Sequence, residues 1–177
     1  MRISDMITSR KMRDGDVEAF EKIIDLYKHK VFNYCLRMTN DYYIAEDLAQ
    51  DVFVKVYQRI TTYDWSKSSL STWIYVISRN TCLNYLRDTK KKTLSEADPQ
   101  LLGTVLTPED LVLQEEERQR LLTALNSLSV QDRELIIMTD YLSLKYREVG
   151  EIMGIPTGTV KSRLHGIRQK LKKDLGE

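Results

Sequence analysis

Apolar residues recur every three or four positions along most of this chain, and this period constrains the fold more than any other feature of the sequence. Such a period places apolar side chains on one face of an α-helix, where they pack against other helices. The first periodic segment follows Asp14 and Asp16, two plausible N-caps, and predicts a helix over residues 16–38. Its apolar face comprises Val17, Phe20, Ile23, Ile24 and Tyr27. The pattern therefore predicts an all-α protein.

Two further segments with the same period complete a first predicted domain. The second segment follows Asn40, and a polar, serine-rich break at residues 61–69 separates it from the third. The apolar stripe of the second comprises Ala45, Leu48, Val52, Phe53, Val56 and Ile60. The inward-facing residues of the third are expected to be Trp73, Ile74, Ile77, Leu83 and Leu86. Three such helices form one compact module, which we assign to residues 1–88.

The periodic pattern stops over residues 89–110, where proline and glycine interrupt helices, and we predict a flexible linker there. Helical periodicity resumes in residues 111–177, the second predicted domain. Its last two helices are expected over residues 144–153 and 158–173, with a break at residues 154–156 between them. This spacing is typical of a helix-turn-helix. The expected architecture is two small helical domains joined by a flexible linker.

The charges of the chain are segregated along its sequence. The formal net charge is only +1, from 27 basic and 26 acidic residues. Residues 40–51 carry four acids and no base, whereas residues 157–173 carry six bases and no acid. Residues 79–92 carry five bases and one acid. Two separate basic segments favour contacts with a polyanion at two places, and they leave an acidic face for another partner.

Several protein classes are excluded by what the sequence lacks. Cys35 and Cys82, the only cysteines, are too few for a disulfide framework or a structural zinc site and indicate a reducing compartment. No apolar run approaches the roughly 20 residues of a membrane span, and the amino terminus has no signal-peptide core, so we expect a cytoplasmic protein. There is no Gly-rich phosphate loop, nucleophile elbow or metal-spaced cluster of histidines. We therefore expect no enzyme activity, catalytic residue, metal, cofactor or small-molecule substrate.

The second predicted helix carries an acidic stripe on the face opposite its apolar residues. The members of this stripe, at spacings of three and four, are Asp47, Gln50, Asp51 and Val54. Because charged residues are mostly exposed, periodicity alone favours a solvated face over a binding site.

The third predicted helix combines aromatic, amide, hydroxyl and basic side chains. This mixture suits single-stranded nucleic acid, because aromatic rings stack on bases while cations contact phosphates. Helix burial explains Trp73 better than DNA binding does. Arg79, Asn80, Asn84 and Arg87 share one predicted face, and nucleic-acid binding and simple solvation explain their spacing equally well.

The last predicted helix presents hydroxyl groups and backbone amides at its amino terminus, which favour phosphate binding. Basic and polar side chains follow in its first turns, where a recognition helix reads base edges. Its apolar face comprises Val160, Leu164, Ile167 and Leu171. A solvated basic helix end is the alternative, but the preceding break between helices favours DNA binding.

Taken in order, these segments resemble a bacterial RNA polymerase sigma factor of the extracytoplasmic-function (ECF) group, which retains only sigma regions 2 and 4. The resemblance covers most of the chain, and three stretches carry it: AEDLAQDVF (residues 45–53), STWIYVISRNTCLNYLR (71–87) and YREVGEIMGIPTGTVKSRL (146–164). The last stretch alone fits many helix-turn-helix regulators, whereas all three in this order are specific.

The resemblance implies three binding surfaces. The beta-prime clamp helices of core RNA polymerase would contact Asp47, Gln50, Asp51 and Val54. The minus-10 promoter element, with a flipped non-template base, would contact Tyr63, Ser71, Thr72, Tyr75, Arg79, Asn80, Asn84 and Arg87. The major groove of the minus-35 duplex would contact Thr157, Thr159, Lys161, Ser162, Arg163, His165 and Arg168. The chain would thus direct promoter-specific initiation and help to melt DNA.

Further partners are implied in the same way. They are the polymerase beta subunit and an anti-sigma factor, often membrane-anchored, which would hold the chain at the inner face of the membrane. The chain would be a monomer when it is not bound to these partners. The alternative is a dimeric helix-turn-helix repressor or activator, which requires a palindromic site with half-sites about one helical turn apart.

This chain departs from the pattern of the family at several positions. Lys145 stands where the family usually has a serine cap, and Gly166 stands where a larger polar residue is common. The loop Asp64–Ser69, which the resemblance implies would select the flipped base, reads DWSKSS. The promoter preference of other family members therefore does not transfer to this chain.

Overall fold

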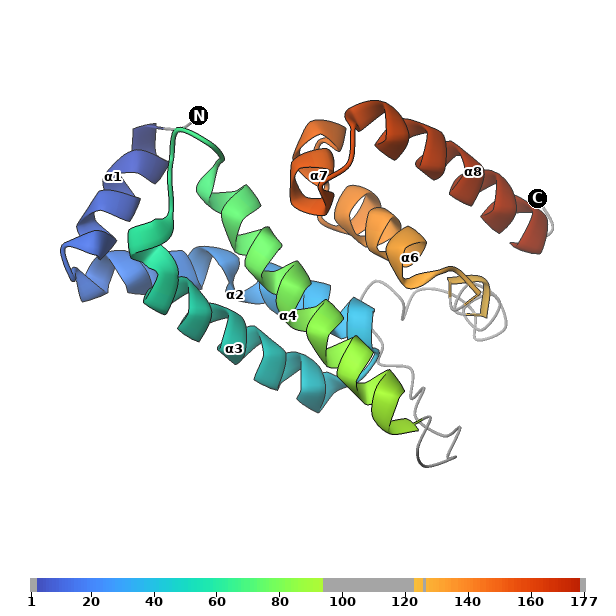
Figure 1. Cartoon of the computed structure of the whole chain (residues 1–177), viewed down its shortest axis with the longest axis horizontal. Helices are drawn as coiled ribbons and strands as arrows, with labels where there is room; N and C mark the ends of the chain where they lie inside the picture. Colours follow the sequence, from blue (N-terminus) through green and yellow to red (C-terminus); the bar gives the residue numbers. More distant parts are fainter. Residues whose placement is uncertain (1–2, 94–122, 126, 176–177) are drawn as a thin grey trace. The chain divides into compact units, whose positions relative to one another are not determined.

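The computed structural model describes residues 3–93, 123–125 and 127–175, and every regular element in these ranges is helical (Figure 1). The chain divides into two compact units, Met1–Leu101 and Leu102–Glu177, which are described separately below. The all-α prediction is confirmed. Most of the predicted linker and the first residues of the second predicted domain lie outside the described ranges, so the domain boundaries stay predictions. Within those ranges, no helix combines the length and the apolar character that a membrane span requires.

The first unit consists, in its described part, of four α-helices and a short 3-10 turn. These elements are α1 (Ile3–Arg13), α2 (Val17–Thr39), α3 (Tyr42–Arg59), η1 (Ile60–Thr62) and α4 (Leu70–Thr93). Helix α2 packs against both α3 and α4, and α3 also packs against α4 (Figure 1). The three helices that the apolar period predicts correspond to α2, α3 and α4.

Helix α1 is missing from the sequence-based prediction, which places no helix before residue 16. It packs against α2 and η1, with Met12 buried and Ile7 about half exposed. Nε of Arg13 donates a hydrogen bond to the carbonyl of Ile60 at 3.4 Å, which ties the end of α1 to η1. Helix α1 is too short for an apolar period to be recognised in the sequence. Part of the surface against which it packs also comes from η1, a segment far along the chain.

Side-chain caps define where α2 and α3 begin. The carboxylates of Asp16 and Asp41 each accept a hydrogen bond from the backbone amide three residues later, at 3.1 and 3.0 Å. Asn40 adopts the left-handed conformation (φ 57°) that ends α2. Of the two N-caps that the sequence suggests, Asp16 is confirmed, whereas Asp14 lies in the turn after α1.

The core of the first unit is formed largely by the apolar faces that the period predicts. Val17, predicted on the inner face of α2, is 62% exposed instead, because it is the first residue of the helix and lies at its open end. Val31 on α2, Val52 on α3 and Ile74 on α4 have no exposed surface. Tyr34 and Tyr75 add an aromatic contact between α2 and α4, with ring centroids 6.5 Å apart. Full burial of an aliphatic or large apolar side chain contributes about 1.5–3 kcal/mol, so these faces dominate the stability of the unit.

Residues 123–125 of the second unit are helical, and three α-helices and a π-helical segment follow in its described part. These elements are α6 (Val130–Ile136), η3 (Ile137–Tyr141), α7 (Tyr146–Met153) and α8 (Thr157–Leu175). Helix α8 packs against α6 and α7. The core of the second unit includes Leu135, Met138, Val149, Val160 and Leu164. The helices predicted over 144–153 and 158–173 are confirmed as α7 and α8.

A tight turn joins α7 to α8. Gly154 ends α7 in the left-handed conformation (φ 69°), which glycine adopts without the steric cost of a Cβ. The backbone amides of Gly154 and Ile155 both donate to the carbonyl of Gly150. A Cβ on Gly150 would lie 2.8 Å from the carbonyl oxygen of Ile155, so the close approach of the turn favours glycine there. The turn therefore confirms the predicted break between the two helices.

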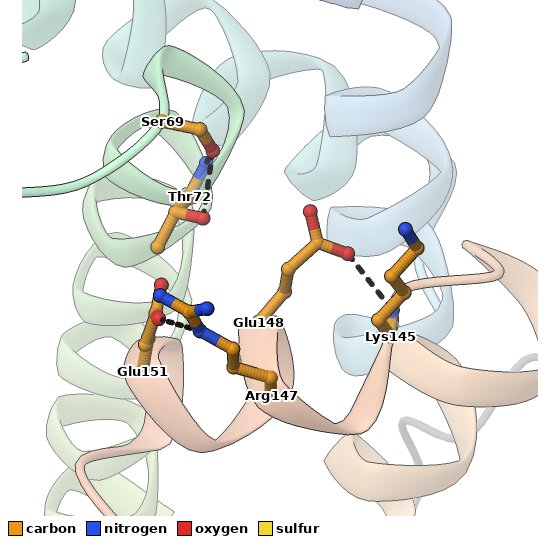
Figure 2. A network of polar contacts seen from close by, with 6 residues as sticks. All are labelled: Ser69, Thr72, Lys145, Arg147, Glu148 and Glu151. Carbon is orange, nitrogen blue, oxygen red and sulfur yellow. Dashed lines mark hydrogen bonds and ion pairs between the residues drawn. The ribbon is translucent and has the colours of Figure 1, made fainter. Parts of the chain in front are cut away.

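Helix α7 begins without a serine cap. The carboxylate of Glu148 accepts a hydrogen bond from the backbone amide of Lys145 at 2.9 Å (Figure 2). This contact is one half of a capping box, and a serine at position 145 would supply the other half. Arg147 and Glu151, one turn apart on the same helix, form an ion pair at 2.9 Å (Figure 2). Glu148 thus satisfies an amide at the helix start despite the departure from the family pattern.

The backbone conformation of the turn between α7 and α8 predicts that alanine at Gly154 and alanine at Gly166 change the stability of the second unit in opposite directions. We expect Gly154→Ala to destabilise the second unit by about 1–2 kcal/mol, because alanine resists the left-handed conformation. Crowding is not the cause, since nothing lies within 4 Å of the Cβ position. Denaturant unfolding followed by circular dichroism measures the change.

Gly166→Ala is the matched control for that prediction. Gly166 lies inside α8 with equally open space around its Cβ position. Alanine should therefore stabilise this helix by about 0.5–1 kcal/mol. Changes of the same sign in the two variants would contradict the special backbone role of Gly154.

Candidate nucleic-acid and protein interfaces

The acidic stripe that the sequence predicts on α3 is exposed in the structure. We call it the α3 face, and its predicted members are Asp47, Gln50, Asp51 and Val54. Val54 is 53% exposed, whereas Leu48 and Val52 on the opposite side are buried. The face therefore combines acidic groups with an exposed apolar group, a combination that suits a protein interface better than a purely solvated surface.

Tyr57 extends the α3 face by a turn, and sequence reasoning missed it. It follows Val54 by three positions, and 56% of its surface is exposed. Its ring lies 5.1 Å from the ring of Phe20 on α2, which limits its freedom. Tyrosine is enriched in protein interfaces, and continuing the stripe by three residues would have found it.

Lys55 connects the α3 face to α4. Its Nζ donates a hydrogen bond to Oγ1 of Thr81 at 3.1 Å and lies 3.9 Å from the carboxylate of Asp51. Thr81 is buried on α4 and directly follows Asn80, one of the residues expected to contact the promoter. A single lysine therefore contacts both the acidic stripe and the neighbouring helix.

Helix α4 exposes only part of the predicted minus-10 set. Asn80, Asn84 and Arg87 are exposed, while Ser71 and Arg79 are half-buried. The three exposed residues recur at intervals of four and three, so they lie on one side of the helix. We call these three residues the α4 face.

Three other members of the minus-10 set are buried: Tyr63, Thr72 and Tyr75 have exposed fractions of 1%, 4% and 1%. The hydroxyl of Tyr63 donates to the carbonyl of Ser68 at 3.0 Å, and its ring centroid lies 5.1 Å from that of Trp73. In this arrangement the three side chains offer no surface to DNA. They pack beneath the start of α4 and between the helices instead, because aromatic burial stabilises the unit.

Hydrogen bonds organise the loop that precedes α4. Oγ of Ser69 accepts a hydrogen bond from the backbone amide of Thr72 at 3.1 Å, so Ser69 caps the start of α4. The same oxygen lies 2.9 Å from Oγ1 of Thr72 (Figure 2). Hydrogen bonds from the hydroxyl and the amide of Ser66 hold the pKa of Asp64 below its ordinary value. Trp65, between them, is 38% exposed. The loop thus exposes part of the Trp65 indole, which sequence reasoning missed. The position of this tryptophan within the polar segment DWSKSS could have indicated its exposure.

The basic residues predicted to read the minus-35 element lie mainly on the surface of α8. We call this surface the α8 face, and its exposed members are Thr157, Lys161, Ser162, Arg163, His165 and Arg168. Thr159 is half-buried. The opposite side of the helix, with Val160, Leu164 and Ile167, is buried. Helix α8 is therefore the second helix of a helix-turn-helix and presents a basic surface, as recognition helices do.

Arg168 differs from the other members of the α8 face. Its Nη2 donates to the carboxylate of Asp140 at 2.9 Å. Hydrogen bonds to Asp140 and to Tyr146 raise the pKa of Arg168 further above its ordinary value. Arg163 makes a longer contact, 3.4 Å, with the side-chain oxygen of Gln131. The structure thus uses Arg168 to hold α8 against η3 and α7.

Groups that could ligate a metal are dispersed in the part of the chain that the structure describes. No three His, Cys, Asp or Glu side chains gather there in a suitable arrangement. The two histidines, His29 and His165, belong to different units.

Comparison with known proteins identifies the family. Residues 23–92 match Sigma-70 region 2, and residues 118–171 match Sigma-70, region 4. The ECF RNA polymerase sigma factor SigW of Bacillus subtilis strain 168 is 33% identical over 178 residues, which cover 94% of each chain. This chain belongs to the ECF sigma factors. The ECF RNA polymerase sigma-E factor of Escherichia coli strain K12 is 29% identical to this sigma factor over 180 residues, covering 96% of this chain and 93% of that relative.

Two solved structures share the fold of this sigma factor. The sigma factor RpoE from Bartonella quintana, solved with the anti-sigma factor NepR, has a TM-score of 0.75 at 24% identity, covering 89% of this chain and 96% of that one. CnrH, solved with the cytosolic domain of CnrY, has a TM-score of 0.72 at 20% identity, covering 97% of both chains. The α3 and α4 faces lie within region 2, and the α8 face lies within region 4.

The position of Tyr63 generates a stability prediction. Tyr63→Phe keeps the buried ring but removes the hydrogen bond to Ser68, so we expect the first unit to lose about 1 kcal/mol of stability. Thermal unfolding measured by circular dichroism tests this. Tyr43→Phe is the matched control, because Tyr43 is 77% exposed and should tolerate the change. Equal melting temperatures for Tyr63→Phe and the unmodified protein would contradict the structural role.

Proposed function

We propose that this chain binds core RNA polymerase and directs it to promoters with minus-35 and minus-10 elements, where it helps to melt the DNA. The supporting observation is the match to both sigma regions, combined with an exposed face on α3, on α4 and on α8. Its role is that of a regulatory, DNA-binding subunit without catalytic activity of its own. The template-directed chemistry remains with the polymerase.

The α3 face is the proposed docking surface for the beta-prime clamp helices. Asp47 and Asp51 supply negative charge, which steers association with a basic partner surface. Val54 and Tyr57 supply apolar area next to these charges, and loss of water from that area supports affinity. Contacts with the beta subunit are proposed to follow once the chain is docked.

The α4 face is the proposed contact for the non-template strand of the minus-10 element. Amide side chains at positions 80 and 84 can hydrogen-bond base edges, and Arg87 can contact phosphate. Half-buried Ser71 and Arg79 lie on the same helix. Binding an extruded base offsets the few kcal/mol that unstacking costs, so melting proceeds without ATP. The buried members of this set, described above, position the helix and its loop.

The α8 face is the proposed reader of the minus-35 duplex. Thr157 and Thr159 lie at the helix start, where hydroxyls and backbone amides favour phosphate. Lys161, Ser162 and Arg163 follow in the first turns, which a recognition helix inserts into the major groove. His165 lies one turn after Lys161 and extends the same surface. Arg168 acts mainly by positioning α8, because its charge is already paired with Asp140.

An anti-sigma factor is a further proposed partner. The solved structures of RpoE and CnrH each contain a second protein, NepR and the cytosolic domain of CnrY. We propose that a comparable partner sequesters this chain, which would otherwise be a cytoplasmic monomer. A membrane-anchored partner would hold it at the inner face of the membrane.

The α3 face yields the first functional prediction. Replacing Asp47 and Gln50 together by alanine should weaken binding to core RNA polymerase by at least about 100-fold, because exposed side chains at the centre of an interface carry much of its affinity. Titration of the fluorescently labelled full chain with purified bacterial core enzyme measures this. The helical circular dichroism should be unchanged, since neither side chain is buried.

Two controls accompany that titration. Gln169 and Asp174 offer the same residue types, exposed on α8, and their double alanine variant should bind core enzyme normally. A core enzyme that accepts another sigma factor but not this chain would contradict the proposal and favour a dimeric helix-turn-helix regulator. Loss of helical signal in the first variant would show that Asp47 and Gln50 are structural.

The α8 face yields the second functional prediction. Arg163→Ala should weaken promoter binding by about 1–3 kcal/mol and relax base preference in the minus-35 element, if this arginine contacts a base edge. The assay uses holoenzyme and promoters that the unmodified holoenzyme selects from a random-sequence library. Lys173→Ala, in the last turn of α8, is the control and should leave base preference unchanged. Identical preferences for Arg163→Ala and the unmodified chain would remove Arg163 from the reading surface.

A further inference from the structure

The only two cysteines of the chain lie in contact inside the first unit. Cys35 is on α2 and Cys82 is on α4, 47 positions apart in the sequence. Both are fully buried, with 0% of their surface exposed. The thiol of Cys82 lies 3.5 Å from Sγ of Cys35 and donates to it. The fold therefore brings the entire thiol content of the chain to one point.

This thiol pair lies on the inner side of a functionally important helix. Tyr34, next to Cys35, contacts Tyr75 on α4, so an aromatic contact also joins the two helices near the sulfurs. Asn80 and Asn84 flank Cys82 in the sequence and are exposed. A covalent bond at this point would join α2 directly to the helix that carries the α4 face.

We propose that Cys35 and Cys82 form a modification site, at which a two-electron oxidant such as hydrogen peroxide produces a disulfide between α2 and α4. One sulfur attacks the peroxide, the O–O bond breaks, and a sulfenic acid and water form. The second sulfur then attacks the sulfenic sulfur, the S–O bond breaks, and the hydroxyl group leaves as water with the thiol proton. Two thiols and one peroxide thus give one disulfide and two waters.

The geometry requires a small movement. A disulfide bond is about 2.0 Å long, so the sulfurs must approach each other by about 1.5 Å from their present separation. Rotation of the cysteine side chains and a slight shift of α4 toward α2 can supply this approach. Oxidation would therefore fix α4 against the body of the unit.

Burial makes this reaction slow and selective. A buried thiol is inert while the fold is closed, so the oxidant reaches it during local opening. The second thiol, already in contact, then captures the sulfenic acid before it is oxidised to sulfinic acid. In a reducing compartment the pair remains as thiols. The chemistry does not depend on the proposed polymerase and promoter contacts.

The test uses the reduced full chain, treated with hydrogen peroxide or, in a second arm, with diamide. The protein is then denatured in the presence of iodoacetamide, which labels every remaining thiol. We expect an unlabelled monomer that is lighter than the reduced protein by two hydrogen atoms. Non-reducing peptide mapping should show Cys35 linked to Cys82, and dithiothreitol should restore both labelling sites.

Three outcomes would overturn the proposal. They are two labelled thiols after a treatment that oxidises a dithiol peptide, separate sulfinic acids at Cys35 and Cys82, and disulfide-linked dimers. Cys82→Ala is the control, because it leaves Cys35 without its partner and should give no intrachain cross-link. Mapping of the unmodified chain decides the matter even if this core variant does not fold. Titration with core polymerase stays an independent measurement, so failure of one proposal does not imply failure of the other.

A second readout follows the stability of the first unit. The cross-link spans 47 positions, so it restricts the unfolded chain and should raise Tm by about 4 °C or more. Reduction of the same sample should reverse the shift. An unchanged or lower Tm in the oxidised protein would contradict the idea that the disulfide fixes α4 against α2.

Discussion

The packing of α2 against α3 and α4 is the interaction on which the first unit depends. Val31, Val52 and Ile74, one from each helix, have no contact with water, and Tyr34 and Tyr75 join two of the helices through their rings. Because one side of each helix is committed to this core, its remaining side is available to partners. The α3 face and the α4 face are therefore consequences of the same burial.

In the second unit the corresponding constraint is the close turn between α7 and α8. Gly150 permits the approach of the turn, and Gly154 provides the left-handed residue that reverses the chain. Arg168 then ties α8 to the preceding segment through Asp140. These contacts hold the basic helix in one orientation, so that Arg163 and its neighbours are exposed together. A recognition helix needs this rigidity, because base readout depends on side chains that arrive in a defined geometry.

Charge in this protein serves two purposes, which the sequence cannot separate. Arg163 and Arg168 belong to the same basic segment, yet Arg168 forms an ion pair with Asp140 at 2.9 Å, whereas Arg163 makes only a longer contact, at 3.4 Å, with the uncharged Gln131. Lys55 likewise contacts Thr81 across two helices rather than extending into solvent. A charge that stabilises the fold is only partly available to a ligand. Which charges bind therefore depends on neighbours that are distant in the sequence.

The amino-acid sequence alone was sufficient for the all-α class, for α2, α3, α4, α7 and α8, and for the exposed stripe on α3. These features depend on local period and on residues a few positions apart, which the order of amino acids records directly. The burial of Tyr63, Thr72 and Tyr75, the role of Tyr57 beside Phe20, and helix α1 emerged only from the folded chain. So did the contact of Cys35 with Cys82. Each of these depends on how separate helices pack, and the hydrophobic period of one helix does not specify which side chain of another will meet it.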